Sequence, residues 1–457
     1  MDRLFGTEGV TGTAVTELTC ELVMSLGRAL VNTLTKKLKH KITVFIGRDT
    51  RKSSDLLESA LTAGICSAGA DVCRLGVVPA AAVAYLVKIN DDADAGIMIS
   101  SPGNGFEING LKFYSSTGYR ISDDMEDEIQ KTVSMNGANS VVSGNKIGTA
   151  TDYNDAQWDY LRYMLKTARA IVSDFTGVRV VIDTANGSGC TAAENLFSAL
   201  GARCFMINNQ PDGVNINDKC GISYIGSLSK TVRSKRADVG LSFDSDTGRC
   251  IVIDENGDIL DGDKIMAVIA LDAKNNGTLK KDAVVVTSAA NIGFNHFAAA
   301  NRICVRSSKS GEKYIMEKLL DGGYVLGGEP NGRLLYPEES TTSDGLLTGI
   351  RILSIIKKTG IKISKLASVM EQYPQVMMNV CIPPHLKEIW KNNSEITDLI
   401  ERRQKNLGSN GRIIVRENPS ESVISVIAEG KNFEEINGYV IEITDVIKKN
   451  TKINSLE

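Results

Sequence analysis

The sequence predicts an α/β protein of three tandem α/β/α domains with mixed, largely parallel sheets, followed by a smaller C-terminal α+β domain. Two observations lead to this prediction. The chain has 457 residues, more than a single hydrophobic core usually organises, so several domains are expected. Strand-like and helix-like segments alternate along most of the chain, and this order changes only after Tyr373-Pro374. We place the domains at residues 1–150, 151–256, 257–370 and 371–457.

The first block alternates helix and strand from its beginning. Leucines recur at helical spacing through residues 17–38, which indicates an amphipathic helix. Ser53 or Ser54 is placed to cap a later helix, because a serine hydroxyl can accept a hydrogen bond from the free amides of the first helical turn. The expected elements are helices at Glu17–Leu38, Asp55–Ala68 and Ala80–Val87, and strands at Ile42–Ile46, Asp71–Leu75 and Ala95–Ile99.

The second and third blocks repeat the alternation, and the last block departs from it. After Tyr373-Pro374 we expect strands and one long polar helix, an order that fits an α+β domain better than another parallel sheet. The expected strands of the two middle blocks lie within residues 178–187, 202–208, 238–244, 283–288, 303–308 and 324–329, and their helices lie from residue 191, near 227–235, around 294–300 and at 312–320. The last block has expected strands at 376–382, 413–415 and 423–428 and a helix around 394–406.

Composition limits the classes of partner. Hydrophobic residues make up 42% of the chain, which supports large cores, and the net charge of -3 with a pI near 5.9 gives no general attraction to nucleic acid or to an anionic membrane. No apolar run is long enough to span a bilayer, and the amino terminus lacks the apolar core of a signal peptide. We expect a cytoplasmic protein without nucleic-acid or membrane partners.

Polar loops follow three of the expected strands. The stretch Ile97–Lys112 opens from a buried strand into serines, a proline and turn-forming residues. Two more strands end in the charged loops Asp244–Arg249 and Gly327–Arg333. Because loops at the carboxyl ends of strands line the ligand crevice of open α/β sheets, we expect these three loops to face one substrate.

The order of these loops, together with FGTEG at Phe5–Gly9, GRDTR at Gly47–Arg51 and NINDKCG at Asn215–Gly221, resembles the phosphohexomutase superfamily, and within it the phosphoglucosamine mutases. The resemblance covers essentially the whole chain. It implies three α/β/α domains and a smaller fourth one. It also implies an intramolecular phosphotransferase, that is, an isomerase, with a phosphoserine loop, a magnesium loop, a sugar loop and a phosphate loop.

The nucleophile loop has lost the hydroxyl that this resemblance implies. Pro102 stands at the phosphoserine position, and proline has no hydroxyl. Ser100 and Ser101 lie next to it, and the sequence leaves two interpretations open: a displaced nucleophile, or serines that only satisfy the loop backbone. A displacement by one residue turns an extended side chain to the opposite side. Arg48 and Lys112 complete the candidate catalytic set.

The metal loop is also incomplete. The resemblance implies three aspartates, of which Asp244 and Asp246 remain, whereas Gly248 stands at the third position. A weak, water-rich magnesium site and a pair of carboxylates that merely cap a turn are both compatible with this sequence. The later Asp261 precedes a helix and is expected to be its N-cap.

The sugar and phosphate loops keep part of their polar residues. Glu329 stands where the resembled family has its sugar-binding glutamate, with Asn331 in place of a serine and Arg333 in place of a histidine. We assign these residues and Arg249 to substrate binding; Arg333 is either a phosphate contact or a solvated loop residue. In the terminal loop, Arg416 and Ser420 are the candidates for weak phosphate binding, because Pro419 removes an N–H donor and Glu417 adds negative charge.

We weigh three hypotheses for function. The first is a catalytically impaired or inactive relative of the phosphoglucosamine mutases with a binding or regulatory role, which pairs with itself as a homodimer or with a genuine mutase as a heteromer. The second is an active phosphohexomutase that converts glucosamine 6-phosphate to glucosamine 1-phosphate, for amino-sugar precursor synthesis, with a displaced serine. The third is a sensor of hexose or hexosamine phosphate that uses Glu329, Arg48, Lys112 and Arg249.

Overall fold

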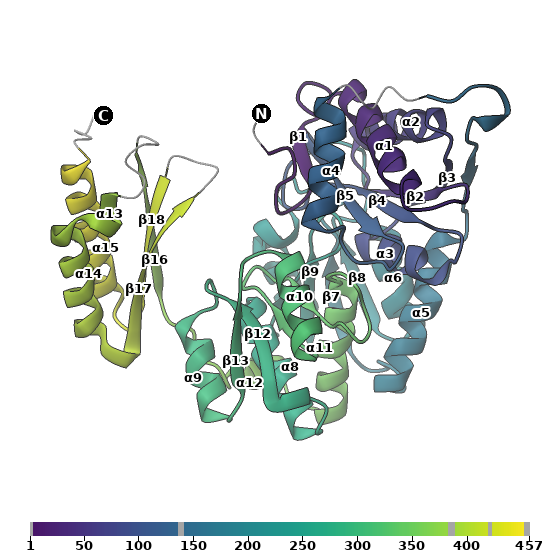
Figure 1. Ribbon diagram of the computed structural model, residues 1–457. Helices are drawn as coiled ribbons and strands as arrows, with labels where there is room; N and C mark the ends of the chain where they lie inside the picture. Colours follow the sequence, from purple (N-terminus) through teal and green to yellow (C-terminus); the bar gives the residue numbers. More distant parts are fainter. Residues whose placement is uncertain (1–2, 136–140, 383–388, 419–422, 452–457) are drawn as a thin grey trace. The chain divides into compact units, whose positions relative to one another are not determined.

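A computed structural model of the chain describes residues 3–135, 141–382, 389–418 and 423–451. The chain divides into two compact units. The first comprises Met1–Ala289 and Arg302–Val369, and the second comprises Ala290–Asn301 and Met370–Glu457. The first unit contains three sheets covered by helices, and the second has one small antiparallel sheet (Figure 1). The predicted fold class is confirmed.

The first sheet has six strands in the order β1-β5-β4-β2-β3-β6. Strands β4, β2, β3 and β6 run parallel, and β1 and β5 add an antiparallel edge. Helices α1, α2 and α4 share one hydrophobic core on one face of this sheet (Figure 1). Its elements are β1 (Val10–Thr13), α1 (Cys20–Thr35), β2 (Thr43–Arg48), α2 (Lys52–Ser67), β3 (Asp71–Val77), α3 (Ala80–Ile89), β4 (Ala95–Ile99), β5 (Ile108–Ser115), α4 (Asp123–Ser134), η2 (Gly144–Lys146) and β6 (Ala150–Asp152).

The second sheet has five strands in the order β11-β10-β9-β7-β8. Strands β9, β7 and β8 are parallel, whereas β10 and β11 are antiparallel to their neighbours. Its elements are α5 (Ala156–Ile171), β7 (Arg179–Asp183), α6 (Cys190–Ala199), β8 (Arg203–Ile207), η3 (Gly221–Ser223), α7 (Gly226–Lys235), β9 (Val239–Phe243), β10 (Cys250–Ile253) and β11 (Ile259–Leu260).

The third sheet has four strands in the order β13-β12-β14-β15, with only β15 antiparallel. The middle strands β4, β9 and β12 are buried at every residue, because helices cover both faces of a parallel sheet, and this explains their continuous apolar sequence. The elements of this part are α8 (Gly262–Asn275), η4 (Lys280–Asp282), β12 (Ala283–Thr287), β13 (Cys304–Ser308), α10 (Glu312–Gly322), β14 (Gly327–Gly328), β15 (Leu334–Leu335), α11 (Gly345–Thr359) and α12 (Ile363–Ala367).

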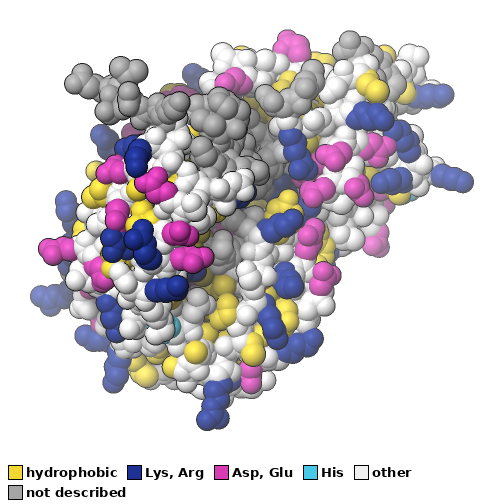
Figure 2. All heavy atoms as spheres, turned by 60° about the vertical axis from the view of Figure 1, so that its left-hand side comes forward, with side chains coloured by type: hydrophobic (Ala, Val, Ile, Leu, Met, Phe, Trp, Pro, Cys, Tyr) yellow, Lys and Arg dark blue, Asp and Glu magenta, His cyan; other side chains and the backbone are white. Residues whose placement is uncertain are grey.

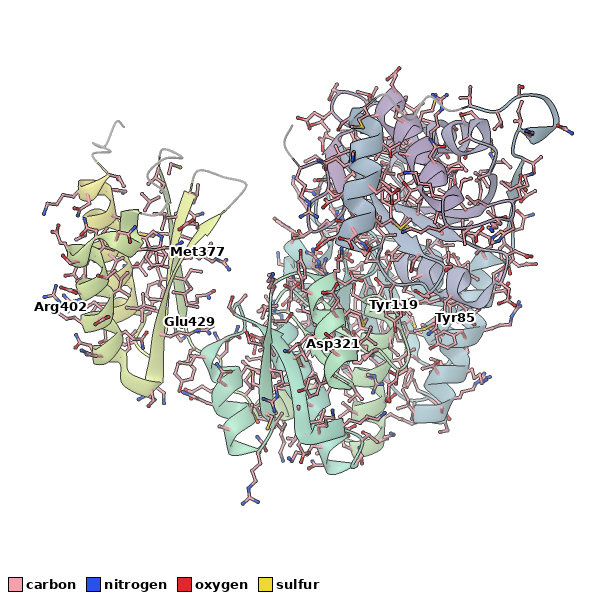
Figure 3. All side chains as sticks on the ribbon, viewed as in Figure 1. Tyr85, Tyr119, Asp321, Met377, Arg402 and Glu429 are labelled. Atoms are coloured by element: carbon pink, nitrogen blue, oxygen red, sulfur yellow. The ribbon has the colours of Figure 1, made fainter. Side chains whose placement is uncertain are left out.

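The second unit is a three-stranded antiparallel sheet in the order β16-β18-β17, packed against helices on one face. Figure 3 labels Arg402 among the helices and Met377 and Glu429 on the sheet. One helix of this unit, α9, comes from the middle of the chain, and its Ile292 amide donates to Glu429 Oε2 at 3.0 Å. The elements are α9 (Ile292–Ala300), β16 (Gln375–Cys381), α13 (Ile389–Asn392), α14 (Ser394–Leu407), η6 (Gly408–Asn410), β17 (Gly411–Asn418), β18 (Val423–Gly430) and α15 (Phe433–Asn450).

Two predicted helix caps have different outcomes. The N-cap at Asp261 is confirmed, since its side chain accepts from the Lys264 amide at 3.0 Å. The prediction for α2 was wrong, because the helix begins at Lys52, so that Ser53 and Ser54 lie inside it. The Ser54 hydroxyl instead donates to Asp49 Oδ1 at 2.8 Å. The Ser54 hydroxyl therefore binds the buried Asp49 carboxylate and does not cap the helix.

The surface agrees with the balanced composition. On the face drawn in Figure 2, basic and acidic side chains are interspersed. None of the helices in the described part of the chain is long and apolar enough to cross a membrane.

Candidate functional site

The three predicted loops occupy equivalent places in their sheets. Each follows a strand that is parallel to a neighbour, β4, β9 or β14, and each leads into an antiparallel strand, β5, β10 or β15. Side chains connect the loops. Lys112 on β5 contacts Asp246 after β9, and Arg333 after β14 contacts Glu8, which precedes β1. The predicted convergence of these loops is therefore present in the first unit.

A buried guanidinium, Arg51, holds the nucleophile loop in place. It pairs with the Asp49 carboxylate and donates to the carbonyl oxygens of Ser101 and Asn104, each at 2.7 Å, and of Gly105 at 3.2 Å. A planar fork of donors suits this task, because one side chain can bind several carbonyl oxygens along a turn. The GRDTR stretch thus fixes the backbone around Pro102.

Both serines that precede Pro102 are buried and form hydrogen bonds. The Ser100 hydroxyl donates to Asp49 Oδ2 at 2.6 Å, and the Ser101 hydroxyl accepts from Asn104 Nδ2 at 2.9 Å. Ser100 has no exposed surface and Ser101 is only 1% exposed. Pro102 is buried as well. A ligand in solution therefore meets a loop whose hydroxyls already form part of the protein interior.

The two aspartates of the metal loop each contact a cation. Lys112 Nζ donates to Asp246 Oδ2 at 2.6 Å, and Arg249 Nε lies 3.5 Å from Asp244 Oδ2. Backbone amides add to this, because the N–H of Gly248 donates to Asp246 Oδ1 and that of Arg249 to Asp244 Oδ1, both at 3.1 Å. The loop is therefore a closed turn with internal countercharges.

Burial and neighbouring charges move the ionisation of these aspartates in opposite directions. Burial, and then the carboxylate of Asp246, raise the pKa of Asp244. Burial also acts to raise the pKa of Asp246, but the Lys112 ammonium more than offsets it, so the pKa of Asp246 lies below its ordinary value. Although burial alone would lower the pKa of Lys112, Asp246 and Glu8 raise it. Lys112 and Asp246 thus form a charged pair.

These residues do not fit a magnesium ion. Octahedral coordination needs several free oxygens, whereas three of the four carboxylate oxygens already accept hydrogen bonds from Lys112 and the amides of Gly248 and Arg249. Among the described residues, the fourth, Asp244 Oδ2, accepts no hydrogen bond and lies 3.5 Å from Arg249 Nε. A Cβ at Gly248 would lie 3.1 Å from both Asp246 Oδ1 and Ser343 Oγ, so there is little room for a third carboxylate. Within the described ranges, no group of three or more His, Cys, Asp or Glu side chains is placed to hold a metal.

Glu8 lies at the centre of three cations. Its carboxylate is 2.6 Å from Arg333 Nη2, 3.3 Å from Lys112 Nζ and 3.5 Å from Arg249 Nη2. Burial acts to raise the pKa of Glu8, but Arg333, Lys112 and Arg249 together hold it well below its ordinary value. Glu8 is therefore ionised at neutral pH. We call these four residues the Glu8 cluster.

The sugar loop is organised around Glu329. This buried carboxylate accepts from the Ser310 hydroxyl at 2.7 Å and the Gly311 amide at 3.1 Å, and it contacts Asn331 Nδ2 and Arg333 Nη1 at 3.5 and 3.4 Å. Asn331 Oδ1 in turn accepts from the Arg333 amide at 3.1 Å. Glu329 thereby orients Arg333 toward Glu8.

Two of the predicted residues lie elsewhere. Arg48 pairs with Asp55 and Glu58 of α2, at 2.6 and 3.1 Å. Arg416 is on β17 of the second unit, and Ser420 lies outside the described residues.

The sequence does not single out Glu8 and Arg51 as site residues, although both lie in motifs that carry the resemblance, FGTEG and GRDTR. A charged residue inside each turn motif was the signal that could have identified them.

The fold and the site define a multidomain α/β protein in which loops from three successive domains build one charged cluster. Residues 2–139, 159–257 and 261–373 match the phosphoglucomutase/phosphomannomutase α/β/α domains I, II and III. The phosphoglucosamine mutase of Acetivibrio thermocellus is 40% identical over 450 residues, which cover 98% of this chain and 99% of that protein. The chain therefore belongs to the phosphohexomutase superfamily.

Solved structures show the same fold at lower identity. A phosphoglucomutase/phosphomannomutase family protein from Burkholderia thailandensis is 19% identical, with a TM-score of 0.80 and coverage of 100% of this chain and 99% of that one. The Aspergillus fumigatus N-acetylphosphoglucosamine mutase, solved in complex with GlcNAc-6P and magnesium, is 15% identical, with a TM-score of 0.65 and coverage of 98% and 96%.

Proposed function

We propose that this protein binds a hexosamine phosphate in a binding or regulatory role and does not carry out the phosphoryl transfer of its relatives. One observation carries the proposal: Pro102 stands at the position of the family's phosphoserine, and the two hydroxyls that precede it, those of Ser100 and Ser101, are buried and hydrogen-bonded to Asp49 and Asn104. A phosphoryl carrier must reach its substrate within bonding distance, and a misplacement of about 1 Å can cost roughly 100-fold in rate.

The state of the two aspartates supports the same conclusion. In-line phosphoryl transfer depends on charge stabilisation at the transferred group, which a metal ion commonly supplies. Here Asp246 and Asp244 hold Lys112 and Arg249, so we infer that ligand binding needs no magnesium.

The groups that would recognise the ligand are still present. Arginine and lysine side chains bind phosphate oxygens, and the Glu8 cluster brings together Lys112, Arg249 and Arg333. Glu329 and Asn331 are placed beside this cluster to accept and donate to sugar hydroxyls. Within the second unit, we also propose Arg416 on β17 as a residue that can bind a phosphate. The domain boundaries at residues 150, 256 and 370 are also part of the proposal. We further propose a partnership with a second copy of the chain or with a genuine mutase.

The test is to compare turnover and binding in the same preparation. The protein is purified from a host that lacks its own phosphoglucosamine mutase, assayed for conversion of glucosamine 6-phosphate to glucosamine 1-phosphate, and titrated with glucosamine 6-phosphate by calorimetry. We expect saturable heat without turnover. A 40% identical mutase, assayed in parallel, is the positive control, and turnover comparable to that control would refute the proposal.

One contact favours a second candidate, the active mutase with a displaced serine. Ser100 Oγ lies 2.6 Å from Asp49 Oδ2, and a carboxylate at that distance could accept the proton of a nucleophile. Incubation with glucosamine 1,6-bisphosphate and magnesium, followed by mass spectrometry of the peptide that contains residues 97–112, decides between the two. Phosphate on Ser100 or Ser101, lost in the double alanine variant, would establish this candidate; an unmodified peptide beside a labelled control mutase would exclude it.

A further inference from the structure

Glu8 stands at the tip of a short turn that is tied to the first sheet. The amide of Gly6 donates to the Gly9 carbonyl at 2.8 Å, and the amide of Gly9 donates back to the Gly6 carbonyl at 3.1 Å. Gly9 has φ +97°, and a Cβ there would lie 2.2 Å from the Leu111 carbonyl oxygen, next to Lys112. The turn therefore holds the Glu8 backbone beside β5, the strand that carries Lys112.

The three cations around Glu8 come from three different domains. Lys112 is on β5, Arg249 follows β9 and Arg333 follows β14. Among the described residues, Glu8 is the carboxylate that forms ion pairs with all three of them. Ammonium and guanidinium groups are the side chains that bind phosphate oxygens, and here Glu8 bridges three of them from three separate loops.

The Glu8 side chain is more exposed to solvent than the three cations that it contacts. The Glu8 side chain is 26% exposed, whereas those of Lys112 and Arg333 are each 4% exposed and that of Arg249 is 17% exposed. The cations are fixed by further carboxylates, since Lys112 contacts Asp246, Arg249 contacts Asp244 and Arg333 contacts Glu329. Glu8 is thus the most exposed member of the cluster, and each of the three cations keeps another carboxylate partner without it.

We propose that the Glu8 carboxylate is an internal substitute for the phosphate of the ligand, and that a phosphorylated sugar binds by displacing it from Lys112, Arg249 and Arg333. This inference rests on the proposed function and adds where the phosphate binds and what competes with it. The ligand class is a phosphate monoester, whose dianion gains more from three cations than the single charge of Glu8 does. Glu8 thus weakens binding, and it keeps the buried cations paired when no ligand is bound.

The test is calorimetric titration of the full chain with inorganic phosphate and with glucosamine 6-phosphate. Glu8→Gln removes the competing charge and keeps the size of the side chain, so the dissociation constant for both probes should fall at least about tenfold, the equivalent of roughly 1.4 kcal/mol. Glu128→Gln is the matched control, because Glu128 forms an exposed pair with Lys36 and carries the same charge. It should leave the dissociation constants within about twofold.

Two further variants complete the test. In Glu8→Gln with Arg333→Gln, the gain in affinity should be lost, because one of the three cations is gone. Glu8→Asp keeps the charge on a shorter side chain, and serves if Glu8→Gln melts at a much lower temperature than the wild type; it should tighten binding by about threefold. An unchanged or weaker affinity of the folded Glu8 variants would overturn the inference. The turnover assay is separate, so that a catalytically active protein would refute the proposed function and leave the role of Glu8 to be decided by these dissociation constants.

Discussion

The Lys112 ammonium donates to the Asp246 carboxylate at 2.6 Å, although the two residues are 134 positions apart: Lys112 is on β5 of the first sheet and Asp246 is in the loop after β9 of the second. Both side chains are almost fully buried. The pair joins the first sheet to the second at the place where a magnesium loop is expected. Removing one partner of a buried ion pair lowers the stability of the folded protein strongly, because the other charge stays buried without a countercharge. Substitutions in this pair therefore test how the loops are held together.

Replacing Lys112 by methionine should destabilise the first unit strongly. Asp246 would remain buried without its countercharge, at a cost of roughly 3–5 kcal/mol, so the midpoint of urea unfolding should fall clearly. Lys36→Met is the control, because it breaks the exposed pair with Glu128 and should cost about 0–1 kcal/mol. Equal midpoints for the two variants would mean that the buried pair contributes no more than a surface pair.

Ser100→Ala should reduce stability without affecting ligand affinity. The buried Asp49 carboxylate would lose one of its hydrogen bonds but keep Arg51, so we expect a loss of about 1–2 kcal/mol. Ser59→Ala serves for comparison, since the exposed Ser59 hydroxyl donates to the Asp55 carbonyl of its own helix and, among the described residues, to no buried carboxylate. A Ser100→Ala variant with wild-type stability and weaker glucosamine 6-phosphate binding would show a role in the ligand site instead.

Gly9→Ala should be far more costly than Gly177→Ala. Both glycines have φ near +90°, where an L-residue is strained by roughly 1–2 kcal/mol. A Cβ at Gly9 would also collide with the Leu111 carbonyl oxygen, whereas one at Gly177 meets no atom within 4 Å. Thermal unfolding of the two variants measures the difference, which isolates the tight approach of the Glu8 turn to β5.

Asp344 predicts a pH dependence of stability. Burial raises its pKa to about 6, so the folded protein keeps this proton where the unfolded chain loses it. The resulting stabilisation is complete at pH values below the pKa of the unfolded chain, near 4, and is lost as the pH rises through 6. Relative to the wild type, Asp344→Asn should therefore gain stability between pH 4 and pH 7, by an amount on the order of 3 kcal/mol. An equal slope of unfolding free energy against pH in both proteins would contradict this.

Magnesium should leave the protein unchanged. A metal that binds only the folded state raises the melting temperature with concentration, but Lys112 and two backbone amides already occupy three of the four carboxylate oxygens of Asp244 and Asp246. We expect the same melting temperature in millimolar magnesium and in chelator. A rise that follows the magnesium concentration would show that the ion displaces Lys112.

The periodicity of the sequence was sufficient to predict the layers of the fold. The strand Ala95–Ile99 was predicted to the residue, because a short apolar run flanked by polar turns has few alternatives. The predicted helix around residues 294–300 also exists, as α9, but its inclusion in the second unit could not be predicted. That depends on contacts of Ile292 with Glu429, which lie far apart in sequence.

The site was predicted only in part, for a similar reason. Loops at strand ends were recognisable because serine, proline and glycine follow the apolar strand segments. The contacts of Lys112, Asp246 and Arg333 agree with the expected convergence of these loops. The central position of Glu8 was not predictable, because a turn of four residues carries no periodic signal and its partners are more than 100 residues away. A short sequence pattern predicts the helix or strand in which it lies, whereas ion pairs between distant residues depend on how the domains pack.

The inclusion of α9 in the second unit has a consequence for dissecting the gene. A fragment that ended at Val369 would keep α9 but lose its partners, among them Glu429 and the Tyr373 carbonyl that accepts from Asn291 at 3.0 Å. Neither piece of such a cut would encode a whole structural unit. A chimera that takes its last part from a mutase relative must therefore exchange two separate stretches of coding sequence together, Ala290–Asn301 and Met370–Glu457.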